Sequence, residues 1–181
     1  RLLVLVSLFC AAVYLQQSTE SKYRSLETSQ EVYYLPPTDW INFFTVGYNE
    51  AAADIIWTKA VLYFSATSKQ MVKSMDRKPE LNDTVNYVET AIELDPKFHK
   101  IYSLGSTFVL YHLGIITEDT AKSAARILKR GIREFPDDGK MMFDLGFLYY
   151  WDMYHVYENS EKRDDVRRIG IQYLQKASMM E

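Results

Sequence analysis

The feature that most constrains the fold is an approximate repeat of about 40 residues in the second half of the chain. Residues 91–96 align with residues 131–136 at an offset of 40, and residues 104–108 align with residues 145–149 at an offset of 41. Apolar residues near these segments recur at spacings of three and four, the period of an α-helix. A repeat of this length and period predicts helical hairpins that lie side by side.

Prolines and capping residues divide the chain into the expected helices. The pair Pro36-Pro37 makes a boundary, because the residue before a proline is disfavoured in the helical conformation. No segment alternates as a strand would, and 7 Gly and 5 Pro among 181 residues favour long regular elements. We expect a helix over residues 40–68, with its break at Gly47. This helix belongs to the first of three expected helical pairs, which cover about residues 40–94, 98–135 and 140–181.

The aligned segments resemble the tetratricopeptide repeat. In that family the first helix carries Leu-Gly followed by an aromatic residue, as at residues 104–108 and 145–149, and the second helix has a small residue five positions before proline. Ala91 before Pro96 and Gly131 before Pro136 fit the second mark. The resemblance implies an all-α, right-handed α-solenoid of stacked hairpins, here with a longer period than the usual 34 residues. An armadillo or HEAT stack is the alternative.

The resemblance also implies a partner-binding groove. If Gly105 and Gly146 occupy the family's glycine position, its groove-facing positions fall on six residues of this chain. They are His99, Tyr102, Lys140, Phe143, Phe147 and Tyr150. Packing within the core is the alternative explanation for their aromatic members.

An apolar run at the N-terminus predicts a membrane anchor. Residues 2–19 carry no charge, and a helix needs about 20 apolar residues to cross a bilayer core. A cleaved secretory signal peptide has a similar apolar core, and acylation of Cys10 as a lipoprotein is a third possibility. We expect a transmembrane anchor over residues 1–19, a polar stalk over 20–37 and a helical repeat domain over 38–181.

The charges that flank this run predict its orientation. Arg1 lies on one side, whereas no basic residue occurs from Gln16 to Glu20 on the other. Because positive charge tends to stay in the cytoplasm, we expect a single pass through the inner (cytoplasmic) membrane with the helical domain in the periplasm.

Composition argues against several other classes of function. The net charge is −3 and the charges of both signs are interspersed, so no basic surface for nucleic acid is predicted. One cysteine cannot make an intramolecular disulfide, a thiolate zinc site or a c-type haem attachment. The three histidines His99, His112 and His155 have no metal-binding spacing. We therefore expect no cofactor, no metal and no small-molecule substrate.

The most unusual polar residue is Asp54, which lies between three alanines and Ile55-Ile56-Trp57. A buried carboxylate there would be a candidate acid–base group. The leading hypothesis is nevertheless a non-enzymatic one, a membrane-anchored scaffold or accessory subunit that binds other protein subunits through its helical repeats. A cell-envelope enzyme that uses Asp54 and a secreted ligand-binding helical module are the alternatives.

Overall fold

The computed structural model describes residues 47–73, 81–112 and 114–180, together with Leu35, Trp40, Ile41 and Thr45. The chain divides into two compact units, residues 1–35 and 36–181, and the described helices belong to the second. The predicted anchor over residues 1–19 lies outside the described residues, as does the predicted stalk apart from Leu35. No helix within the described ranges is both long enough and apolar enough to cross a membrane.

The described part of the chain is all-α, without a strand. Its helical elements, in chain order, are α3 (Asn49–Lys73), α4 (Leu81–Leu94), α5 (His99–Leu110), α6 (Glu118–Glu134), α7 (Gly139–Phe147), the π-helical segment η2 (Leu148–Met153), α8 (Tyr154–Val156) and α9 (Ser160–Ala177).

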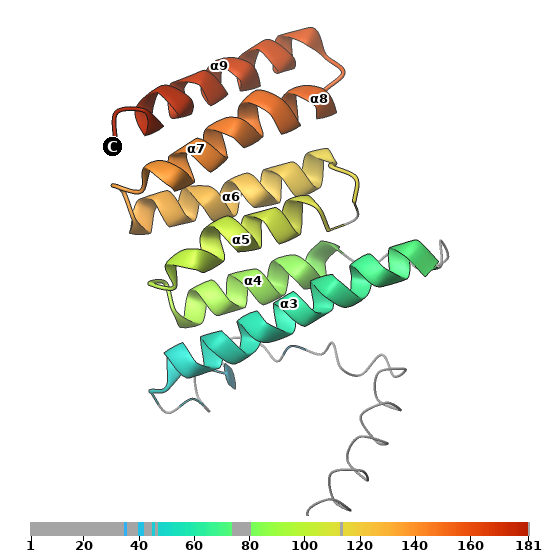
Figure 1. The fold of residues 1–181 in the computed structure, drawn as a ribbon, viewed down its shortest axis with the longest axis vertical. Coiled ribbons are helices and arrows are strands. Elements are labelled where there is room, and N and C mark those ends of the chain that lie inside the picture. The colour runs from blue at the N-terminus through green and yellow to red at the C-terminus, as the bar shows by residue number, and fades with distance from the viewer. Residues whose placement is uncertain are drawn as a thin grey trace, which may run out of the picture. The chain divides into compact units, whose positions relative to one another are not determined.

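Neighbouring helices pack against each other in the order of the sequence (Figure 1). The most extensive contacts join α3 to α4, α5 to α6, and α7 with η2 to α9. Smaller contacts join α4 to α5 and α6 to α7. This arrangement is compatible with a helical repeat fold.

The helix ends follow local signals in the sequence. Gly47, the predicted break, is a turn residue with a φ of 92°, and α3 begins two residues later. Positive φ strains residues that carry a Cβ, which is why glycine suits this turn. Thr117 caps α6, since its side chain accepts a hydrogen bond from the Thr120 amide and the Thr120 hydroxyl accepts one from the Thr117 amide.

The backbone repeats with a period of 40 residues rather than 41. Helix α4 ends at Leu94 and α6 at Glu134, while α5 begins at His99 and α7 at Gly139. The predicted match of Gly105 with Gly146 is therefore wrong by one position. The reason is that Gly105 allows close packing against α4, whereas Gly146 allows close packing against α9.

The two glycines contact different helices. A Cβ added to Gly105 would lie 2.6 Å from Val88 Cγ1 of α4, whereas one added to Gly146 would lie 3.1 Å from the Gly170 carbonyl oxygen of α9. One residue corresponds to a turn of about 100° around an α-helix. The alignment by glycine consequently rotated the predicted faces of the two helices relative to each other.

Candidate functional site

A groove of about 200 Å³ runs between α5 and α7 and continues to η2, and we name it the α5–α7 groove. Its walls combine large apolar side chains with hydroxyl and carboxylate groups. The lining residues are Ser103, Leu104, Ser106, Thr107, Leu110, Tyr111, Leu128, Lys140, Phe143, Asp144, Phe147, Leu148 and Asp152.

Four of the apolar side chains in this groove are exposed to solvent. Phe143 is 52% exposed and Phe147 is 44% exposed, and their rings lie 6.3 Å apart with an interplanar angle of 20°. On the opposite wall, Leu104 of α5 is 46% exposed, and Tyr111, which follows α5, is 43% exposed. Contiguous exposed apolar surface of this kind marks interaction sites more often than isolated apolar residues do.

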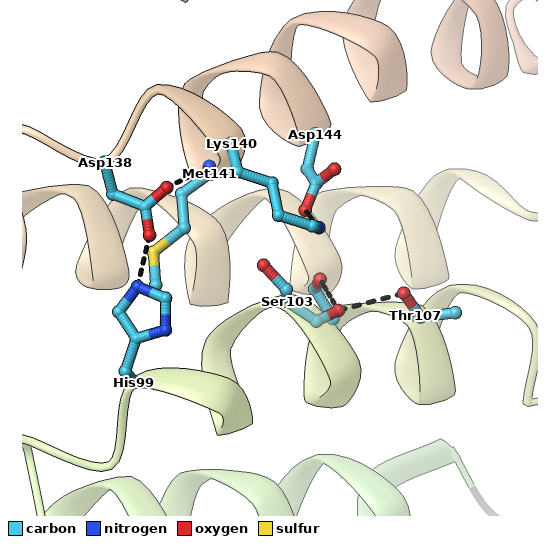
Figure 2. A network of polar contacts seen from close by, with 8 residues as sticks. His99, Ser103, Thr107, Asp138, Lys140, Met141 and Asp144 are labelled. Carbon is cyan, nitrogen blue, oxygen red and sulfur yellow. Dashed lines mark hydrogen bonds and ion pairs between the residues drawn. The ribbon is translucent and has the colours of Figure 1, made fainter. Parts of the chain in front are cut away.

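Polar groups along the groove are largely paired with one another (Figure 2). The Lys140 ammonium group lies 2.7 Å from the Asp144 carboxylate, one helical turn away on α7. On α5, the hydroxyl groups of Ser106 and Thr107 both donate to the Ser103 carbonyl oxygen, at 2.8 and 2.9 Å. The charges on this stretch of α7 therefore cancel, and the α5 wall presents hydroxyl groups without a net charge.

The N-terminal ends of α5 and α7 are tied together beside the groove. The Asp138 carboxylate accepts a hydrogen bond from the Met141 amide at 2.9 Å and so caps α7. The same carboxylate pairs with Nε2 of His99, which is the first residue of α5 (Figure 2). His99 thus supports the structure of the groove end, and it stays available at the surface because its side chain is half exposed.

Of the six residues predicted to face the groove, three line it: Lys140, Phe143 and Phe147. His99 lies at the end of α5, beyond the lining residues. Tyr102 and Tyr150 are not among the lining residues.

Tyr102 is fully buried instead of facing the groove. Its hydroxyl donates to the Pro96 carbonyl oxygen at 2.9 Å, and its ring packs edge-on against Phe135. Burial raises the pKa of its hydroxyl, and the Arg130 guanidinium partly offsets that rise. In the 40-residue register the α5 positions that match Phe143 and Phe147 are Ser103 and Thr107.

Tyr150 faces α9. The guanidinium of Arg167 lies 5.2 Å from the centre of the Tyr150 ring and donates to its hydroxyl at 3.2 Å. The helix containing Tyr150 changes from α to π at Leu148. A π-helical turn holds more residues than an α-helical turn, so the family spacing no longer predicts which face Tyr150 occupies.

Asp152, which lies at the η2 end of the groove, was not among the site residues predicted from the sequence. Its side chain is 6% exposed and lines both the α5–α7 groove and an adjoining pocket with Ile116, Thr117, Trp151, His155 and Val156. Burial raises the pKa of the Asp152 carboxyl, and the nearby His155 partly offsets the rise. The signal in the sequence was a lone carboxylate within the aromatic run at residues 149–154.

Asp54, the acid that the sequence singled out, is exposed rather than buried. The buried stripe of α3 consists of Ala53, Ile56, Ala60 and Tyr63, at spacings of three and four. Asp54 follows Ala53 by one residue, about 100° around the helix, and Ile55 beside it is 61% exposed. The prediction of a buried acid at this position is therefore wrong.

The described residues contain no group of three or more His, Cys, Asp or Glu side chains that is placed to bind a metal ion. A comparison of the chain with protein-family models, with curated proteins and with solved structures finds no match. The case for a function therefore depends on the groove.

Proposed function

We propose that the protein is a membrane-anchored scaffold or accessory subunit that binds a segment of another protein in the α5–α7 groove. The observation that carries this proposal is the stacked, half-exposed pair Phe143 and Phe147 beside Leu104 and Tyr111. Their four side chains leave a large apolar area in water, and each square ångström of apolar area covered by a partner contributes about 25 cal/mol.

The packing of the helices supports a binding role. Stacked helical hairpins of the tetratricopeptide-like solenoid type offer extended surfaces between their first helices, and α5 and α7 are the first helices of neighbouring pairs. The groove has hydroxyl groups on one wall and aromatic rings on the other. A partner segment finds both apolar contacts and hydrogen-bond partners there, which is the usual composition of a recognition site.

The proposed membrane location rests on the sequence of residues 2–19 and its flanking charges. We propose that this segment is a single anchor and that the helical domain lies in the periplasm. If so, alkaline carbonate should leave the chain in the membrane fraction, and a protease should digest the domain in spheroplasts but not in intact cells. Release of the chain by carbonate would contradict the membrane anchor. Protection of the helical domain from protease in spheroplasts would contradict the periplasmic orientation.

The binding role is tested by purification of the full chain from its native membranes in a mild detergent. The informative variant is Phe143→Ser with Phe147→Ser, and the matched control is Ile55→Ser with Leu62→Ser, a pair on α3 of similar or greater exposure. A specific partner should co-purify with the natural chain and with the control. The groove variant should recover at least tenfold less of this partner. Recovery of the natural chain only as a free monomer would contradict the proposal.

A further inference from the structure

We propose that the α5–α7 groove recognises an arginine side chain of its partner, with the guanidinium group against the Asp152 carboxylate. This inference rests on the proposed function and specifies the chemistry of the bound segment. The partner we infer is an extended protein segment in which this arginine follows or precedes apolar side chains that contact Phe147 and Phe143.

The first observation is that no hydrogen bond or ion pair joins the Asp152 carboxylate to another described residue, although the His155 ring acts on it electrostatically. The side chain is only 6% exposed, but its oxygens reach solvent, because the described residues have no side-chain oxygen or nitrogen atom that is both shut off from solvent and without a hydrogen-bond partner. Removing most of a carboxylate from water is costly where the protein offers no hydrogen bond in exchange. Residues that bear such a cost are frequently functional, and this one opens onto two pockets.

The second observation is that the other charged groups around it are already engaged. Lys140 and Asp144 pair with each other. His155 uses its Nδ1 atom for the Trp151 carbonyl oxygen, at 2.6 Å, and its ring packs against the Trp151 ring at a centroid distance of 4.6 Å. The Asp152 carboxylate is therefore the charge of the groove that makes no direct pair within the described residues, and a cationic group of a partner would complement it.

Aromatic side chains on both sides favour arginine over lysine. Tyr111 shares the α5–α7 groove with Asp152, and its hydroxyl has a pKa raised by burial and also by the Asp152 carboxylate. Trp151 is 53% exposed and lines the adjoining pocket with Asp152. A guanidinium group stacks on aromatic rings and forms two parallel hydrogen bonds with a carboxylate, whereas an ammonium group is a more strongly hydrated point charge.

The spacing along α7 and η2 predicts a motif. Phe143 and Phe147 are four residues apart on α7, which is about 6 Å along the helix axis. Asp152 follows five residues later, the spacing of one hydrogen-bonded turn in a π-helix such as η2. Two residues of an extended chain span about 6.6 Å, and alternate side chains point to the same face. The bound segment should therefore place apolar, apolar and arginine side chains at alternate positions.

The inference is tested with a phage-displayed library of random dodecapeptides, selected on the purified 181-residue chain in mild detergent. We expect the enriched peptides to carry arginine two residues from an apolar residue. The best of them is then synthesised with a fluorescent label, both as selected and with citrulline in place of arginine, because citrulline keeps the shape and loses the charge. Anisotropy titrations give the dissociation constant of each.

Two variants complete a double-mutant cycle with these peptides. Asp152→Asn should weaken binding of the arginine peptide at least tenfold and leave the citrulline peptide nearly unchanged, since a charge-assisted pair is lost only in the first case. Asp54→Asn is the matched control, because it makes the same chemical change on an exposed carboxylate of α3 that does not line the groove. It should change the affinity less than threefold.

The outcomes separate this inference from the function on which it rests. Peptides that require Phe143 and Phe147 but show no arginine preference, or that bind Asp152→Asn normally, would overturn the arginine site and leave the binding groove intact. Equal losses with Asp54→Asn and Asp152→Asn would also overturn it, since they would indicate general attraction to acidic groups. Failure to select any peptide that depends on Phe143 and Phe147 would overturn both.

Discussion

Two positions 40 residues apart, His112 and Asp152, show how one repeated backbone position serves two purposes. His112 follows α5 and is fully buried, and its Nδ1 atom lies 2.8 Å from the Thr84 hydroxyl of α4. Asp152 is the matching position after α7, but 40 residues after Thr84 the chain has Ala124, which offers no hydroxyl. The comparison teaches that the polar side chain at this position is held by a hydrogen bond after α5, whereas after α7 it makes none to another described residue and reaches solvent.

The backbone differs at the same place. Helix α5 ends at Leu110, and Tyr111 and His112 form a turn. Helix α7 instead continues as the π-helical segment η2 and then as α8. Such π segments are uncommon and frequently occur at functional sites. In this protein the segment brings Trp151 and Asp152 to the wall of the groove and its adjoining pocket.

The largest expected effect tests whether α9 packs more closely on η2, within the third pair, than α5 packs on α4 of the first pair. A Cβ at Gly170 would lie 2.6 Å from the Tyr150 amide nitrogen, and one at Gly105 would lie 2.6 Å from a methyl group of Val88. Gly170→Ala should lower the free energy of unfolding by about 2–3 kcal/mol, because backbone must move. Gly105→Ala should cost less, since a side chain can shift. Urea unfolding measures both, and an equal or larger loss at Gly105 would contradict the difference.

The next largest effect on stability concerns the hydrogen bond between Thr84 and His112. Thr84→Val removes the hydroxyl that pairs with His112 and keeps the shape of the side chain. We expect a loss of about 1–2 kcal/mol in the free energy of unfolding, the usual cost of a lost buried hydrogen bond. Thr107→Val on the exposed side of α5 is the matched control and should change stability by less than about 0.5 kcal/mol. If the two variants lose the same amount, the His112 pair does not stabilise the second pair of helices.

Asp152→Asn should raise the free energy of unfolding, in contrast to the preceding variants, which lower it. Because burial raises the pKa of this carboxyl in the folded chain, the folded state binds more protons than the unfolded state between the ordinary aspartate value, about 3.9, and the raised value. The stability of the natural chain therefore falls as pH rises through that window, and the deficit persists at neutral pH. We expect the variant to gain about 1 kcal/mol at pH 7 and to lose this part of the pH dependence.

Urea midpoints from pH 4 to pH 8 measure this prediction. A variant that is less stable than the natural chain at pH 7 would show that the carboxylate is held by favourable contacts. In that event the contrast with His112 disappears, and so does the reason to regard Asp152 as an open site.

The smallest effect concerns Lys140, whose pair with Asp144 is exposed on the groove surface. Lys140→Gln should change the free energy of unfolding by less than about 0.5 kcal/mol, because exposed pairs of this spacing contribute little. The measurement is again the urea midpoint, and a loss above 1 kcal/mol would show that the ion pair is part of the structural core of α7.

Much of the fold was predictable because helix boundaries are decided by neighbouring residues. The turn at Gly47, the cap at Thr117 and the end of α4 before Pro96 each depend on contacts within a few residues. The candidate site was only partly predictable. The structure places Phe143 and Phe147 of α7 in the groove lining, and it buries Tyr102 of α5 because Gly105 contacts α4 instead of repeating the contact of Gly146.

Asp54 and Asp152 also show that the burial of a side chain cannot be predicted from its neighbours in the sequence alone. Asp54 and Asp152 both lie among apolar neighbours in the sequence, and nothing local distinguishes them. Asp54 is exposed because it falls beside the buried stripe of α3, and Asp152 is buried because the π-helical turn places it next to α5 and the loop before α6.

The sequence by itself determined the all-α class, the positions of the turns and the 40-residue spacing of the helix ends, since these follow from caps, prolines and apolar periodicity along one segment. Only the tertiary structure decided which apolar side chains stay in water and which carboxylate lacks a partner. Exposure and pairing are properties of the space between helices, and that space depends on residues far apart in the chain.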